Sequence, residues 1–219
     1  MFTYSAEINR EGQYIFVQGG IGLLRNVDET AEGLDFVADL QVYSRTRIIT
    51  NFIPQLEAVS GIRRVVSVST GTSEGEIDFD DFQLLNGGGI GKQRAHNSSI
   101  ISLANIYFVE NSPIISFVHD YPGHVKSGIS RGTTGVLKAA FLVINALGSL
   151  LFFKPEQESG AQHLYYLTSA CYKAKEGVEE SVPLGEGVAT ARGVDGVSGS
   201  GVYSCDADNE EASDKVEKV

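Results

Sequence analysis

The sequence predicts an α/β fold in which a parallel sheet carries helices on both faces. Short runs rich in β-branched and aromatic residues predict buried strands at 13–17, 64–68, 114–119 and 201–205. Segments with helical periodicity lie between these runs. Strands that alternate with helices favour parallel pairing, because each crossover helix returns the chain to the same end of the sheet.

Each helical segment has its own signals. The first begins after Thr30, a suitable N-cap, and Pro54 bends or ends it. The next covers 92–111 and follows an acidic, then glycine-rich loop at 78–91. The remaining helices are expected at 135–153 and 160–173, before an irregular glycine-rich stretch at 177–199.

Composition restricts the class of protein. A chain of 219 residues can bury the core of one domain, which we place at 1–205 with an acidic tail at 206–219. The net charge of −11 disfavours nucleic acid and anionic lipid as partners. The apolar run at 139–153 is shorter than the roughly 20 residues that span a bilayer. With only Cys171 and Cys205 and no leader-like start, we expect a cytoplasmic protein.

The most informative segment follows the strand at 114–119. The strand runs into Pro122 and Gly123, and Ser127 comes four residues later. In an open α/β sheet, ligands bind outside the carboxyl ends of the strands. A Pro-Gly corner at that edge turns the chain over the binding crevice. His119, at the end of the same strand beside Asp120, is either a catalytic or a packed histidine.

Two glycine-rich segments do not satisfy the motifs they approach. The turn at Gly20 and Gly22 has Arg25 where a dinucleotide fingerprint needs a third small residue. The run at 87–92 lacks both the earlier glycine and the hydroxyl residue of a phosphate loop. The four histidines show no metal-ligand spacing, so no metal site is expected.

Six segments, taken in order, match one known family. They are Thr30-Ala-Glu-Gly-Leu-Asp35, Tyr43-Ser-Arg45, Arg64-Val-Val-Ser-Val68, Glu74-Gly75, Asp80-Asp81 and Phe117 to Ser127. Their order and spacing resemble those of the short-chain dehydrogenase/reductase superfamily, and more narrowly a fungal branch found in secondary-metabolite clusters. The resemblance implies a partial Rossmann-like sheet made of family strands 4 to 7. It also implies an oxidoreductase that acts on a small hydrophobic metabolite with NADP or NAD.

The resemblance assigns catalytic positions one at a time. The family's active-site asparagine corresponds to Gln41, and its serine to Ser67 or Ser69. Its tyrosine corresponds to His96, and the lysine four residues later corresponds to Ile100. This alignment is loose, because the segment from Gly87 to Arg94 allows it to shift. No Tyr-x-x-x-Lys occurs there in any register. A tyrosine phenol needs a nearby cation to ionise at neutral pH, so the active site is degenerate and redox competence is in question.

The cofactor side is also incomplete. By resemblance, Gly20 belongs to the turn after the family's fourth strand, and Pro122, Gly123 and Ser127 cover the nicotinamide. Three parts of the family's cofactor site have no counterpart here: the first strand, its phosphate-binding turn and the ribose-selecting residue. The resemblance therefore implies a chain truncated at its N-terminus. We expect it to bind the cofactor partially or not at all.

Three functions therefore stay open. The first is the family's oxidoreductase activity. The second is a cofactor-independent isomerase, dehydratase or cyclase in which His96 or His119 acts as acid or base, with Ser69 bonded to a carbonyl oxygen. The third is a non-catalytic remnant or interaction module. Without the family's first strand, the edge from Tyr14 to Val17 is unpaired. Three explanations are open for this edge. Residues 1–10 fold over it, two copies pair there as a homodimer, or the coding sequence is incomplete.

Overall fold

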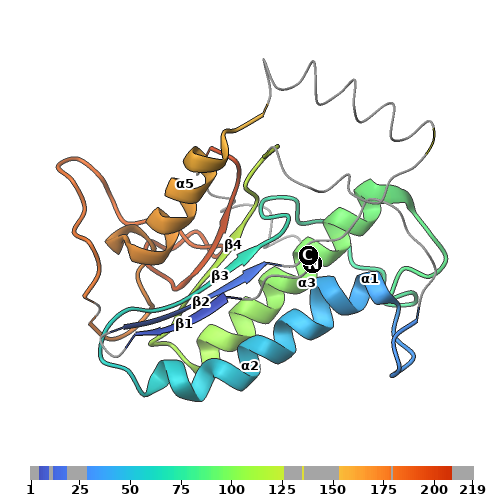
Figure 1. The fold of residues 1–219 in the computed structure, drawn as a ribbon, viewed down its shortest axis with the longest axis horizontal. Coiled ribbons are helices and arrows are strands. Elements are labelled where there is room, and N and C mark those ends of the chain that lie inside the picture. The colour runs from blue at the N-terminus through green and yellow to red at the C-terminus, as the bar shows by residue number, and fades with distance from the viewer. Residues whose placement is uncertain are drawn as a thin grey trace.

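The protein folds around one five-stranded sheet (Figure 1). The computed structural model describes residues 5–9, 12–18, 29–125, 135, 153–178 and 180–208. The strands follow the order β1-β2-β3-β4-β5, with β1 antiparallel to β2 and every later pair parallel. The predicted parallel sheet is thus confirmed. The strands are β1 (Ser5–Asn9), β2 (Gly12–Gln18), β3 (Arg63–Val68), β4 (Ser116–Asp120) and β5 (Val202–Cys205).

The N-terminal segment covers the strand edge that the sequence left unpaired. In the β1–β2 register, Ser5 lies opposite Phe16 and Asn9 opposite Gly12. The first of the three explanations given above, a fold-back of the N-terminal residues, is therefore the one that the structure adopts. A homodimer through Tyr14 to Val17 remains a prediction, and a second copy approaching from that side would meet β1 before β2.

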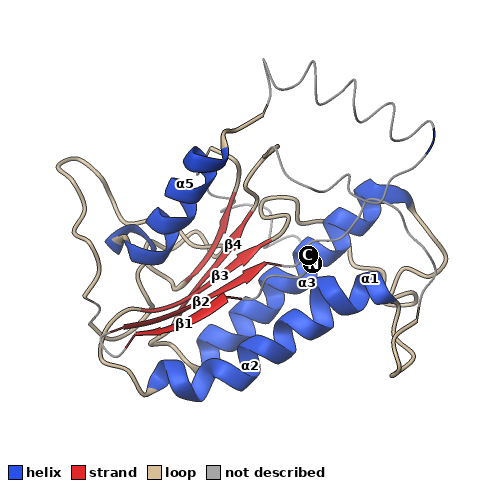
Figure 2. Ribbon diagram, viewed as in Figure 1, coloured by secondary structure: helices blue, strands red, loops and turns tan. Residues whose placement is uncertain are grey.

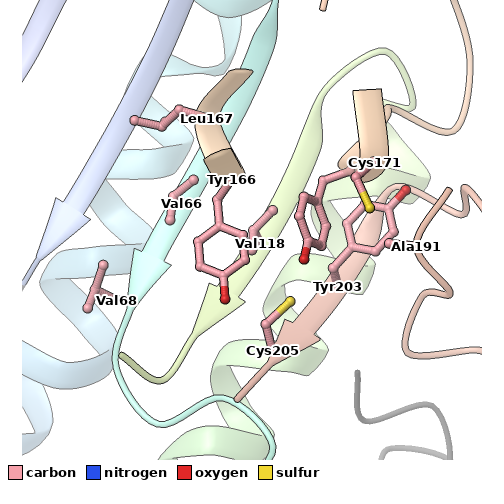
Figure 3. Close-up of a cluster of buried hydrophobic side chains, with 10 residues drawn as sticks. Val66, Val68, Val118, Tyr166, Leu167, Cys171, Ala191, Tyr203 and Cys205 are labelled. Carbon is pink, nitrogen blue, oxygen red and sulfur yellow. The ribbon is translucent and has the colours of Figure 1, made fainter. Parts of the chain in front are cut away.

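Helices cover both faces of the sheet (Figure 2). On one face, α2 (Ser44–Glu57) and α3 (Gly89–Asn111) form a layer; on the other lies α5 (Glu156–Thr168). Both faces of the sheet carry apolar side chains for these helices to cover, because neighbouring strand residues point to opposite faces. The α2–α3 cluster contains Ile49, Leu56, Val65, Phe108, Val109, Phe117 and Val202. The α5 cluster contains Val66, Val118, Tyr166, Leu167, Cys171, Tyr203 and Cys205 (Figure 3).

The first long helix differs from its prediction. It begins with α1 (Phe36–Ala38), passes through a π-helical turn at Asp39–Tyr43 and continues as α2. Asp35, rather than Thr30, caps it, because its Oδ1 accepts from the N–H groups of Val37 and Ala38. Pro54 lies inside α2 and does not end it. Leu56, fully buried in the core beyond the proline, stabilises the last turn despite the missing hydrogen bond.

The other predicted helices within the described residues are formed, but their ends are shifted. The helix α3 starts inside the glycine-rich stretch, and α5 starts four residues before its predicted start and ends at Thr168. A short 3₁₀ helix, Ala170–Tyr172, follows it. The described part of 177–199 contains turns and isolated bridges. The helix predicted at 135–153, apart from its two ends, and the tail beyond 208 lie outside the described residues. Within the described residues, no helix has both the length and the hydropathy needed to cross a membrane.

Candidate active site

The carboxyl ends of β3 and β4 bring two of the predicted motifs together. Ser69 directly follows β3, and its N–H donates to the Asp120 carbonyl over 2.7 Å. Pro122 and Gly123 follow β4, and Gly123 has a φ of +78°, which favours glycine. The half-buried hydroxyl residue and the Pro-Gly corner thus share the edge at which open α/β sheets bind ligands.

The two serine candidates differ in burial. Ser67 is fully buried within β3, beside His119 of β4, and its hydroxyl has no hydrogen-bond partner among the described residues. Ser69, two residues further along, lies past the end of the strand and is half-buried. The two side chains share one face of the sheet, but the packed strands enclose only the first.

Gln41 lies in the π-helical turn, and π-helical turns occur frequently at functional sites. Its Oε1 accepts a hydrogen bond from Nδ2 of Asn97 on α3. This bond joins the helix that carries Gln41 to the helix that carries His96. Asn97 was not predicted from the sequence, because the resemblance assigned its neighbour His96 to the site.

His96 bonds to the loop that precedes α3 and fixes it. Its imidazole is fully buried; Nδ1 accepts from the Asp78 N–H at 3.1 Å, and Nε2 donates to the Phe82 carbonyl at 3.0 Å. Both ring nitrogens are therefore engaged by backbone groups. This geometry requires the neutral imidazole with its proton on Nε2, and it leaves no ring atom for proton transfer to a ligand.

The face of α3 toward the strand ends carries Arg94 and Ser98 instead. Ser98 donates to the Thr70 carbonyl at 2.7 Å, and Nε of Arg94 donates to Oγ of Ser73 at 2.9 Å. Arg94 and Ser98 are four residues apart, the same spacing that separates His96 from Ile100. Side chains two positions apart on an α-helix point about 200° apart, so a two-residue change of register changes which pair faces the ends of β3 and β4.

His119 and Asp120 do not form a catalytic pair, because consecutive strand residues point to opposite faces. His119 lies on the α3 side, where its Nε2 accepts from the Thr70 N–H at 3.3 Å and its Nδ1 donates to Ser102 at 3.0 Å. Asp120 lies on the α5 side, with Oδ2 2.9 Å from Nε2 of His163. Both are fully buried.

A buried carboxylate completes the polar cluster around His119. Ser102 and Ser204 each donate to Oε1 of Glu74 over 2.6 Å, and Nδ1 of His119 lies 3.6 Å from the same oxygen. Burial alone raises the pKa of Glu74, but the imidazole of His119 and the two hydroxyl donors outweigh it and lower the pKa to about 2. This ionised cluster ties the loop after β3 to α3, β4 and β5.

Of the other predicted positions, Gly20 and Ser127 lie outside the described residues. Among those described, histidine, cysteine, aspartate and glutamate form no group able to hold a metal ion. The two cysteines are reduced and buried.

Comparison with known proteins identifies the family. No family model matches the chain. It is 33% identical to oxidoreductase AN1596 of Emericella nidulans, over 90% of this chain and 68% of that protein. It is 28% identical to oxidoreductase andH of Emericella variicolor, over 89% of this chain and 66% of that protein. It is 24% identical to the short-chain dehydrogenase/reductase SAT2 of Stachybotrys chartarum, over 87% of this chain and 54% of that protein.

The fold and these relatives define the class, an α/β protein of the short-chain dehydrogenase/reductase superfamily. Within it, the chain belongs to the fungal oxidoreductases. It spans about two thirds of the length of the two Emericella relatives and about half of the Stachybotrys protein.

The family typically uses NAD(P), and the described residues fit only part of that cofactor. Such folds hold the pyrophosphate where a strand turns through glycines into a helix N-terminus. Here β1 runs antiparallel beside β2 and joins it at the opposite end of β2, where Asn9 faces Gly12. The described residues therefore provide no pyrophosphate seat next to β2. The position of Pro122 and Gly123 beside a nicotinamide remains a prediction.

Proposed function

We propose that this chain supplies the substrate-binding part of an oxidoreductase that acts on a small, largely apolar metabolite bearing a carbonyl or hydroxyl group. The observation that carries the proposal is the position of Ser69 at the end of β3, beside the Pro122–Gly123 corner. The names of the relatives support the redox class.

In this proposal Ser69 donates a hydrogen bond to the oxygen of the reacting group. A fixed donor aimed at an oxygen that gains negative charge during the reaction accelerates the reaction. Gln41, held by Asn97, fixes the π-helical turn before α2 against α3. Because the described residues offer no seat for a pyrophosphate, we assign them no part in binding the rest of the cofactor.

The test uses 2-tetralone as an apolar ketone and NADPH as the reductant. We expect saturable ketone binding, with weak use of NADPH by this chain. The Ser69→Ala variant should lower turnover by about 10²-fold, the loss typical of one removed oxyanion donor. Ser60→Ala, at an exposed serine after α2, is the matched control. If millimolar NADPH neither binds nor is consumed, the redox function of this chain is wrong.

The alternative of a cofactor-independent isomerase, dehydratase or cyclase has less support. It needs an acid or base that a ligand can reach, and His96 and His119 are both fully buried and bonded through both ring nitrogens. Rearrangement of 2-tetralone or a related enone without NADPH, abolished in the His96→Asn, His119→Asn double variant, would favour it over the redox proposal.

A further inference from the structure

We propose that Arg94 binds a carboxylate on the substrate, so that the metabolite is an apolar carboxylic acid. The inference rests on the substrate crevice proposed above and names the class of molecule that occupies it. Arg94 is half-buried on the second turn of α3, on the face directed toward the ends of β3 and β4.

The guanidinium is held in place from two sides. Nε donates to Oγ of Ser73 at 2.9 Å, and the guanidinium carbon lies 4.0 Å from the ring centroid of Tyr121, the residue before the Pro-Gly corner. An arginine stacked on an aromatic ring loses less side-chain freedom when it binds an anion. Arg94 is thus oriented before any ligand arrives.

The loop that supplies Ser73 is itself fixed. The Ser73 N–H donates to the Thr70 carbonyl at 3.1 Å, and the Thr72 N–H donates to Ser204 at 2.8 Å. Thr72 has a φ of +62°, which is strained for a β-branched residue. Strained backbone persists where the surrounding structure over-determines it, and such positions cluster at ligand sites.

No acidic side chain neutralises Arg94 within the described part of the chain, where its contacts are Ser73 and Tyr121. This is unusual in a protein with 28 acidic and 17 basic residues. The buried guanidinium groups of Arg45 and Arg64 differ, because both donate to backbone carbonyls inside the fold. Arg94 keeps two NH₂ groups for an external acceptor.

The charge at this edge matches a monoanion. Among the described residues, Lys92 pairs with Asp78 and Lys154 donates to Gln162, so both of these cations are already engaged. One guanidinium supplies one positive charge and two parallel donors, the arrangement that fits a carboxylate. A phosphate dianion would leave a second negative charge uncompensated in a chain of net charge −11.

The test compares 4-phenylbutyrate with the neutral 4-phenylbutyramide, by calorimetry and ligand-detected NMR on the full chain without cofactor. We expect the acid to bind about tenfold or more tightly than the amide, because charge-assisted hydrogen bonds are stronger than neutral ones. Arg94→Gln should abolish this preference, while Arg94→Lys should keep part of it. Arg47→Gln, at an exposed arginine of α2, should leave it unchanged.

Equal binding of acid and amide, a preference that survives in Arg94→Gln, or no saturable binding of the acid would each overturn the inference. Circular dichroism of each variant confirms that it folds. The outcomes separate this inference from the redox proposal. Carboxylate preference without NADPH turnover would support the Arg94 site and reject the redox function. Turnover without carboxylate preference would support the redox function and reject the Arg94 site.

Discussion

Gly71 lies where the loop after β3 passes between the ends of β4 and β5. A Cβ atom at this position would lie 2.4 Å from the His119 carbonyl oxygen and 2.6 Å from that of Cys205. Both neighbours are backbone atoms, so a methyl group forces the loop or the strands to move. The absence of a side chain at Gly71 therefore allows the loop that carries Ser73 to pack against the sheet.

We expect Gly71→Ala to lower the free energy of unfolding by about 1–3 kcal/mol, the usual cost of overpacking. Gly91→Ala is the control, because an added Cβ there meets nothing within 4 Å and the residue lies in α3. Alanine should be neutral or stabilising at that helical position. Urea unfolding followed by circular dichroism measures both, and equal stability of the two variants would contradict the close approach.

The cluster around Glu74 makes stability depend on pH. Its pKa falls from 4.5 to about 2 in the folded chain. A group whose folded pKa is depressed stabilises the fold fully above its unfolded pKa, and that contribution is lost as the pH falls through the folded pKa. The contribution of Glu74 is therefore present above 4.5 and decreases progressively toward pH 2.

Replacement of the carboxylate tests this assignment. We expect Glu74→Gln to lower the free energy of unfolding most at about pH 7, with the difference from the parent chain shrinking by about pH 3. Glu76→Gln, at the exposed glutamate two residues later, should show no such trend. A difference between Glu74→Gln and the parent chain that is the same at both pH values would show that the buried carboxylate is not ionised.

At the scale of elements, the loop between β3 and α3 depends on His96. The imidazole bonds Asp78 and Phe82, and its ring makes an edge contact with Phe82 at 5.6 Å between centroids. We expect His96→Phe to keep the aromatic packing but remove both hydrogen bonds, lowering the free energy of unfolding by about 1–3 kcal/mol. Hydrogen exchange should quicken at the amides of 78–86.

The control for the loop is the ion pair between Lys92 and Asp78, whose charged atoms lie 2.6 Å apart at the surface. Lys92→Ala should cost less than about 1 kcal/mol, because exposed ion pairs contribute little. If exchange in the loop responded equally to Lys92→Ala and His96→Phe, the role assigned to the buried imidazole would be wrong.

The strands were predictable because buried strands are rich in β-branched and aromatic residues. The runs at 64–68 and 201–205 consist of residues that suit a sheet covered on both faces, and they appear as β3 and β5 with ends shifted by one residue. The segment that forms β1, Ser-Ala-Glu-Ile-Asn, has no comparable composition. Its strand forms by pairing with β2, which is a tertiary interaction and leaves no local signal.

The candidate site was predictable at strand ends and less so on helices. A residue that follows a buried strand, such as Ser69, is fixed at the sheet edge by the strand itself. On α3, the face that meets the ends of β3 and β4 depends on the helix register. Five residues at 87–91 that include four glycines leave that register open in the sequence. For this reason the sequence pointed to His96, whereas Arg94 and Ser98 face the ends of β3 and β4 on the folded helix.

At the scale of the whole molecule, the sheet ends on one side in β1. An unpaired edge of β2 would invite association with another chain, and β1 occupies that edge through five residue pairs. The apolar run from Tyr14 to Val17 is therefore matched to a partner from the same chain. This arrangement predicts that the association state of the protein depends on the integrity of β1.

We expect Glu7→Pro, at the middle of β1, to promote association that increases with protein concentration. Proline removes a backbone donor and is poorly tolerated within a strand, so β1 should detach and expose the edge of β2. Light scattering after size exclusion measures the mass, and Glu29→Pro, outside the sheet at an exposed position, controls for the substitution itself. If the mass of Glu7→Pro matched that of the parent chain while hydrogen exchange in β2 quickened, β1 would not be what keeps copies apart. The homodimer predicted through Tyr14 to Val17 would then have no support from the exposed edge.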